Sequence, residues 1–149
     1  MATKSRGSGA RRSARELALQ MLFQFDLSGN DVDHILERFD DLERAREDIR
    51  RFAIRLFRGT VEHRDEIDDR IQRQAQHWKM SRMAVVDRNI IRMSVYELMY
   101  ERETPHLVVI DEAIEIGKRF GTEKSSQFIN GILDGILKRY NLETVPRKS

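Results

Sequence analysis

Apolar residues recur three or four positions apart along almost all of this chain, and only two prolines, Pro105 and Pro146, interrupt the pattern. This spacing places the apolar side chains on one side of an α-helix, whereas strict alternation would indicate a strand. Residues that favour helices are abundant throughout. The sequence therefore predicts an all-α protein, a compact single-domain bundle of about seven helices.

The positions of the expected helices follow from their apolar stripes and their end signals. The first helix should begin at Ser13, because residues 13–16 read SARE, the pattern of a capping box. The segment 83–101 is apolar on nearly every side, so we expect it at the centre of the bundle. Pro105 should force an extended link, and Gly121 should end a helix in a left-handed conformation. The expected helices cover residues 13–28, 32–39, 45–63, 65–75, 83–101, 109–120 and 125–140.

Positive charge is concentrated at the start of the chain. The first fifteen residues hold five basic side chains and no acidic one, so the overall net charge of +2 conceals a slightly acidic remainder. Basic arms of this kind typically follow a phosphate backbone, because each Lys or Arg near a phosphate releases a counterion. The alternative is a basic end that serves only solubility. We expect a flexible basic arm over 1–12, a helical domain over 13–140 and a tail over 141–149.

Several classes of protein are excluded by what the chain lacks. It has no cysteine, which excludes thiol catalysis, disulfides and cysteine-ligated zinc. The sole Glu-x-x-His, from Glu103 to His106, contains Pro105, and the carboxylates over 65–69 are typical of a hydrated helix face. No apolar run is long enough to span a membrane. We therefore expect a cytoplasmic protein that is not an enzyme and has no cofactor and no metal.

Two regions combine aromatic and polar side chains in a way that suits RNA. Phe23 falls outside the apolar stripe of the first helix, on a face that it shares with Gln20. At the start of the last helix, Lys124, Ser125, Ser126 and Gln127 precede Phe128. Polar groups for phosphate and sugar beside an aromatic ring for a base suit single-stranded RNA. The alternative at the second region is an ordinary serine-capped helix whose phenylalanine belongs to the core.

Four separate motifs, in the same order and spacing, resemble the NusB family. Residues 11–23, 95–98, 111–121 and 128–134 read RRSARELALQMLF, VYEL, DEAIEIGKRFG and FINGILD. The resemblance runs from about residue 11 to residue 137. It implies a bundle of seven helices and a bacterial transcription antitermination factor that catalyses no reaction.

The resemblance also implies partners and site residues. NusB proteins bind the boxA element of nascent ribosomal transcripts, as single-stranded RNA, together with the small-subunit ribosomal protein that acts as NusE. Other Nus factors and RNA polymerase join the antitermination complex. By motif, Asp87 matches the family's acidic contact to the ribosomal protein. The residues that correspond to the family's RNA surface are Arg11, Arg12, Arg15, Gln20, Phe23, Lys124, Ser125, Ser126, Gln127 and Phe128.

Three of these positions depart from the family's pattern. Phe23 stands where relatives often have tyrosine, Lys124 where some have an acidic residue, and Gln127 where some have a basic one. Lys4 and Arg6 have no assigned role. A helical protein-interaction module without RNA binding of its own is the alternative function, and both a monomer and a homodimer are compatible with the sequence.

Overall fold

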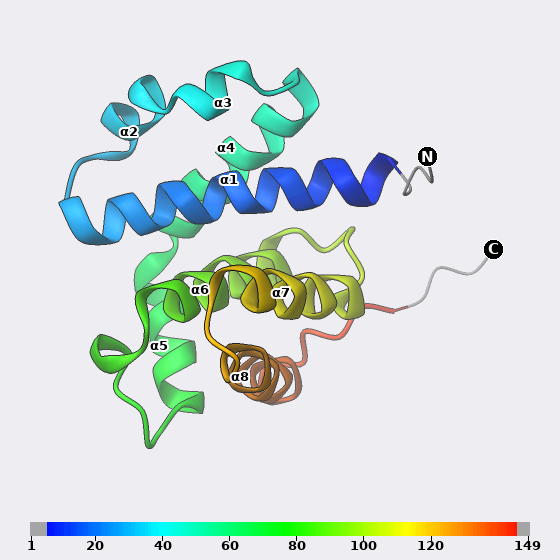
Figure 1. Ribbon diagram of the computed structural model, residues 1–149. Coiled ribbons are helices and arrows are strands. Elements are labelled where there is room, and N and C mark those ends of the chain that lie inside the picture. The colour runs from blue at the N-terminus through cyan, green and yellow to red at the C-terminus, as the bar shows by residue number, and fades with distance from the viewer. Residues whose placement is uncertain (1–5, 146–149) are drawn as a thin grey trace. The chain divides into compact units, whose positions relative to one another are not determined.

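The structure is a computed structural model that describes residues 6–145, with side chains from residue 9 onward, and over that range it is helical without strands (Figure 1). The all-α prediction is confirmed. The described residues form eight α-helices and one short 3-10 helix, close to the predicted seven. They fall into two units, one that ends at Glu62 and one that begins at His63.

The first unit is organised by the pairing of its two long helices. It contains α1 (Arg6–Ser28), α2 (Val32–Arg38), α3 (Asp40–Arg44) and α4 (Glu47–Glu62), and α1 packs chiefly against α4. Phe25 of α1 meets Phe57 of α4 edge to face, with ring centroids 6.3 Å apart. The other buried apolar residues of these two helices include Ala14, Ala18, Leu19, Met21, Leu22, Phe52, Ala53 and Leu56.

Helix α1 begins at Arg6 and not at Ser13, which corrects both the predicted capping box and the predicted flexible arm over residues 6–12. Ser13 is an exposed residue within the helix. Extending an existing helix fixes one residue for each new hydrogen bond, so an extra turn is easily added where a side chain holds it. Arg11 supplies such a contact, because its guanidinium lies 4.0 Å from the centre of the Phe52 ring in α4. Lys4 lies outside the described residues.

The second unit is built around α6. It contains α5 (Arg64–Gln74), the 3-10 helix η1 (Met80–Arg82), α6 (Val85–Tyr100), α7 (His106–Phe120) and α8 (Ser125–Arg139). Helices α5, α7 and α8 all pack against α6. The helix predicted to be central is therefore the centre of this unit, and its fully buried side chains include Ile90, Ile91, Met93 and Val95.

Helix ends account for most of the remaining differences from the predictions. Helix α3 and η1 were not predicted, and both are five residues or fewer. Helix α7 begins directly after Pro105, whose fixed φ suits the start of a helix, and not at residue 109. Gly121 has a φ of −99° and is not left-handed. It is needed for space, because a Cβ at this position would collide with the Ser125 side chain.

Candidate nucleic-acid interface

The predicted RNA residues of α1 divide between two sides of the helix. Since successive residues turn by about 100°, Arg12, Gln20 and Phe23 fall within about 80° of one another, and Arg11 and Arg15 fall on a neighbouring strip. Gln20 is exposed, Arg12 is half-buried, and Phe23 is 37% exposed. We call Arg12, Gln20 and Phe23 the α1 stripe. It combines a cation, an amide and an aromatic ring along one face of a single helix.

Arg11 and Arg15 turn instead towards α4. The Arg11 guanidinium lies 4.0 Å from the centre of the Phe52 ring, and that of Arg15 lies 5.5 Å from it. Arg15 is 3% exposed, whereas Arg11 is exposed. A cation over an aromatic face is attracted by the negative potential of the ring. Arg15 thus stabilises the packing of α1 on α4, while Arg11 stays accessible to a ligand.

The serine hydroxyls at the start of α8 are both used within the second unit. The buried Ser125 Oγ accepts a hydrogen bond from the Thr122 amide at 2.9 Å, which fixes the turn before the helix. The Ser126 Oγ donates to the Ile114 carbonyl oxygen of α7 at 3.2 Å. Lys124 and Gln127 are exposed on either side of this pair. The side chains directed to solvent are therefore those of Lys124 and Gln127.

Phe128 does not stand alone, since it packs against a residue that sequence reasoning missed. Its ring meets that of Trp78 edge to face, with centroids 6.1 Å apart. Trp78 is 61% exposed and lies between two of the predicted helices, 65–75 and 83–101. The local signal in the sequence is a tryptophan in a mostly polar segment, residues 76–82. Large apolar side chains that reach solvent often mark binding surfaces.

Trp78 and Phe128 form part of a groove of about 490 Å³, which we call the α8 groove. Its lining is mainly apolar, with basic side chains among it. The lining residues are Trp78, Lys79, Arg82, Met83, Ala84, Asp87, Lys124, Gln127 and Phe128. The groove thus brings Asp87, predicted as a protein contact, to the same surface as three of the predicted RNA residues.

Asp87 is the most unusual group in the α8 groove. The residue is 8% exposed, and its Oδ1 atom has no hydrogen-bond partner. A buried carboxylate oxygen without a donor is unfavourable, and a cationic or hydrogen-bonding group from a ligand would relieve this cost. The groove is therefore suited to a partner that inserts a basic side chain.

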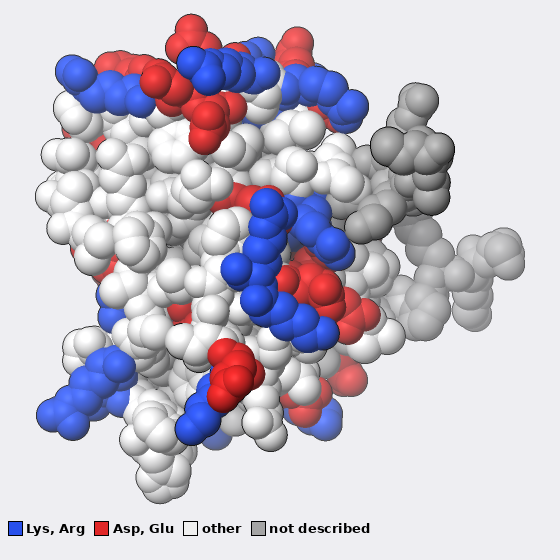
Figure 2. Space-filling model, viewed as in Figure 1, with Lys and Arg blue, Asp and Glu red and all other residues white. Residues whose placement is uncertain are grey.

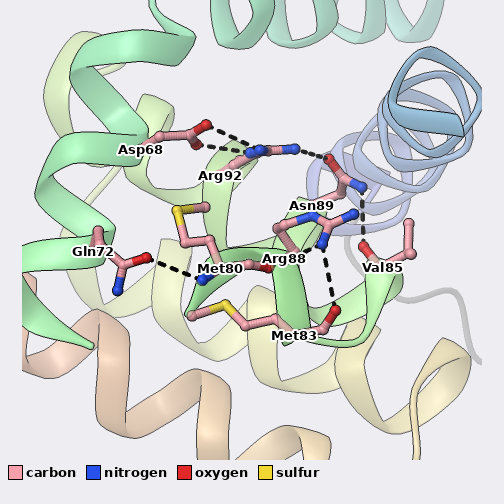
Figure 3. Close-up of polar contacts among 8 residues, drawn as sticks. All are labelled: Asp68, Gln72, Met80, Met83, Val85, Arg88, Asn89 and Arg92. Atoms are coloured by element: carbon pink, nitrogen blue, oxygen red, sulfur yellow. Dashed lines mark hydrogen bonds and ion pairs between the residues drawn. The ribbon is translucent and has the colours of Figure 1, made fainter. Parts of the chain in front are cut away.

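One wall of the groove is held by hydrogen bonds to α5 (Figure 3). Arg92 of α6 donates to both carboxylate oxygens of Asp68, at 2.8 and 2.9 Å, and at 3.2 Å to Asn89 Oδ1. The Gln72 side chain accepts a hydrogen bond from the Met80 amide at 3.0 Å. Bidentate arginine–carboxylate pairs fix geometry as well as adding energy. The start of α6 and the preceding η1 are thus positioned before any ligand arrives.

Charged side chains lie in small groups on one face of the protein. On the described part of the face shown in Figure 2, basic and acidic side chains alternate and no single large basic patch covers it. On that face, attraction for a polyanion would come from local groups of a few cations.

The acidic run over residues 65–69 is bound within its own unit. Asp68 pairs with Arg92, Asp69 with Arg73, and Glu66 accepts a hydrogen bond from the Tyr100 hydroxyl. That hydrogen bond is the main cause of a raised pKa for Tyr100, with a further contribution from burial. In the described part of the chain, no three His, Asp or Glu side chains gather where a metal ion could be held. Likewise, none of the described helices is long and apolar enough to cross a membrane.

Comparison with known proteins gives one consistent family. The family model described as the NusB family matches residues 12–138. A protein of Koribacter versatilis, named transcription antitermination protein NusB, is 46% identical over 140 residues, which cover 91% of this chain and 94% of the relative. A protein of the same name from Geobacter sulfurreducens is 49% identical over 129 residues, covering 86% and 94%.

Solved structures give the same family. The chain is similar to T. maritima NusB, with a TM-score of 0.80 and 41% identity over 98% of this chain and 96% of the other. It is also similar to a chain in a crystal structure of the antitermination factors NusB and NusE in complex with dsRNA. In that case the TM-score is 0.80 and the identity is 28%, covering 89% of this chain and 98% of the other.

Proposed function

Since the chain belongs to the NusB family, we propose that it is a non-catalytic transcription antitermination factor that binds boxA RNA of nascent ribosomal transcripts. It does so with the ribosomal protein that acts as NusE, and other Nus factors and RNA polymerase complete the complex. Its place of action is the cytoplasm. The observation that carries the proposal is the likeness to a chain solved with NusE and RNA, which extends over 89% of this chain.

The first unit contributes phosphate contacts and one stacking surface. Arg11 and Arg12 bind phosphates, Gln20 donates or accepts a hydrogen bond at a base or sugar, and Phe23 stacks on a base. Arg15 supports this surface by its position over Phe52. If three to five phosphates are neutralised in all, the logarithm of the affinity falls with the logarithm of salt concentration at a slope of about −2 to −3.5 for a single strand.

The second unit contributes directional contacts and the protein partner's site. Lys124 and Gln127 bind phosphate and sugar, and Phe128 with Trp78 offers aromatic surface to a base. Ser125 and Ser126 act by fixing the start of α8, because their hydroxyls are engaged by Thr122 and Ile114. Asp87 attracts a basic side chain of the ribosomal protein to the α8 groove, which its carboxylate helps to line.

Binding experiments with matched RNAs test the proposal. The purified protein is titrated with a boxA single strand, with a scrambled strand of equal length, and with the boxA strand paired to its complement. The related complex contains dsRNA, so the third probe decides which form this chain prefers. We expect preference for the boxA single strand and a further gain when the ribosomal protein is present. Equal binding to boxA and scrambled RNA would reject the proposal, and partner binding without any RNA binding would favour the interaction module.

A further inference from the structure

A second basic feature of the first unit lies outside the predicted RNA surface. It is a cleft of about 390 Å³ where α1 meets the start of α4, and we call it the arginine cleft. Its lining residues are Ala10, Arg11, Arg46, Asp48, Ile49, Arg51, Phe52 and Arg55. Of these, only Arg11 belongs to the residues predicted from the sequence. Four arginines against one aspartate give the lining a formal charge of +3.

Phe52 holds several of these cations in place. Its ring has the guanidiniums of Arg11, Arg55 and Arg15 at 4.0, 5.1 and 5.5 Å from its centre. Each such contact limits the conformations that a long side chain samples, so less freedom is lost when a ligand binds. Phe52 itself is 4% exposed. The cleft therefore offers positioned charge but no open ring on which a base could stack.

The single carboxylate in the lining is already neutralised. Arg46 donates to both Asp48 oxygens, at 3.1 and 2.8 Å, and this hydrogen bonding keeps the pKa of Asp48 below its ordinary value. Asp48 is thus ionised at neutral pH and paired with Arg46. The other cations of the lining are Arg11, Arg51 and Arg55. Arg51 also pairs with Glu47 at 3.4 Å, in an exposed pair of the kind that salt and competing anions readily displace.

We propose that the arginine cleft binds phosphate groups of single-stranded RNA outside boxA, so that the transcript continues from the α1 stripe along the start of α4. This inference rests on the proposed RNA-binding function. Guanidinium groups bind phosphate through paired N–H donors and remain charged at any physiological pH. Because no base can stack on the buried Phe52, the contact is independent of sequence.

Continuity with the α1 stripe favours RNA over a free anion or an acidic peptide as the occupant. Arg11 lines the cleft, and the next residue, Arg12, begins the stripe on the same helix. A strand that passes Phe23, Gln20 and Arg12 along α1 reaches Arg11 next. An RNA chain carries a phosphate at every nucleotide, so a run of cations beyond the recognition element can be used without any sequence requirement.

The test compares a short boxA strand with the same strand extended by about ten uridines at each end. The variant is Arg51→Ala with Arg55→Ala, and the control is Arg58→Ala, whose guanidinium instead pairs with Asp33 at 2.7 Å. For wild type, the extended strand should bind more tightly. Loss of two phosphate contacts should lower the affinity for the extended strand about 25-fold at about 0.1 M salt and reduce its salt slope by about 1.4. The control should behave as wild type, and affinity for the short strand should be unchanged.

Two outcomes would overturn the inference: the double variant retains the full advantage of the extended strand, or it loses affinity equally for both strands. The single variant Arg51→Ala controls for misfolding, because Arg51 does not stack on Phe52. This variant should have the thermal transition of wild type and about half of the change in salt slope. Failure of the proposed function is seen separately, since wild type would then not distinguish boxA from scrambled RNA. Wild type that distinguishes them while the double variant keeps its extension advantage rejects only the cleft.

Discussion

The surface of the first unit and that of the second differ in how each can attract a ligand. In the first unit several arginine guanidiniums lie over the ring of Phe52, which is almost fully buried. This ring positions the cations and has almost no surface of its own to offer a ligand. In the second unit Trp78 and Phe128 are themselves on the surface, and the charge of interest, Asp87, is buried. Aromatic rings thus have opposite roles. The first unit, which has more of the proposed phosphate contacts, is suited mainly to salt-dependent attraction, and the second, with one such cation in Lys124, mainly to a specific fit.

The largest effect should come from the buried charge of the α8 groove. Asp87→Asn keeps the shape of the side chain and removes the charge that attracts a basic group, so affinity for the ribosomal protein should fall about 100-fold. Affinity for RNA alone should stay within about twofold of wild type. Calorimetric titration of the partner measures the first effect. Asp111→Asn, an exposed acid on α7, is the matched control and should change neither affinity.

An unchanged partner affinity in Asp87→Asn would show that the groove takes another ligand. The thermal stability of the isolated Asp87→Asn variant provides a second test. Because Asp87 Oδ1 has no donor in the free protein, removing the charge should not lower the thermal transition.

The next largest effect should come from the arginines of the first unit. Arg11→Ala with Arg12→Ala removes two phosphate contacts, which should weaken binding to boxA and scrambled RNA alike by about 25-fold at about 0.1 M salt. Fluorescence anisotropy over a range of salt concentrations measures it. Arg38→Ala with Arg44→Ala, exposed on α2 and α3, removes the same charge elsewhere in the unit. If the control pair weakens RNA binding as strongly, net charge and not position explains the result.

A smaller effect should follow from removing the half-buried ring of Phe128 in the second unit. Phe128→Ala eliminates stacking on one base, which should cost about 1–2 kcal/mol of RNA binding and narrow the preference for boxA over scrambled RNA about tenfold. The slope with salt should not change, since no cation is lost. Phe120→Ala, a partly exposed ring at the end of α7, is the control. A preference equal to that of wild type would remove Phe128 from the site.

The smallest effect separates a positioning role from a contact role. Ser126→Ala removes the hydrogen bond to the Ile114 carbonyl oxygen and should lower the free energy of unfolding by about 1 kcal/mol. RNA affinity should stay within about twofold, because the hydroxyl faces α7. Denaturant unfolding and RNA titration of the same preparation measure both. A large loss of RNA affinity at unchanged stability would mean that the hydroxyl contacts RNA directly.

The predicted fold came from local periodicity, and its errors lie where tertiary contacts override local signals. Apolar residues occur on nearly every side of the predicted helix 83–101, and this pattern correctly predicted that α6 lies at the centre of a unit. A helix that is buried on all sides needs apolar residues on all sides, so its burial can be predicted from the sequence. The extension of α1 to Arg6 depends on a contact between Arg11 and Phe52, about forty residues apart, which periodicity does not record. Helix α3 is only five residues, too short for an apolar stripe.

The candidate site was predictable to a similar extent. The sequence predicts Arg11, Arg12 and Arg15 on one surface, whereas the structure turns Arg11 and Arg15 towards Phe52. Trp78 was missed because its partner, Phe128, is fifty residues away and nothing local connects them. The arginines of α4 were missed for the same reason, since only the pairing of α1 with α4 brings them beside Arg11. Sequence reasoning can propose groups that lie on one helix, but it does not show which surfaces two helices form together.

The central claim is that the first unit supplies most of the charge-driven part of RNA binding, with Lys124 the one cation assigned to phosphate in the second unit. The most direct measurement is the dependence of boxA affinity on salt for wild type, Arg11→Ala with Arg12→Ala, and Phe128→Ala. We expect a slope of about −2 to −3.5 for wild type, a reduction of about 1.4 in the arginine variant, and no change in the phenylalanine variant. A flat response in wild type, or an equal slope in wild type and the arginine variant, would contradict the account.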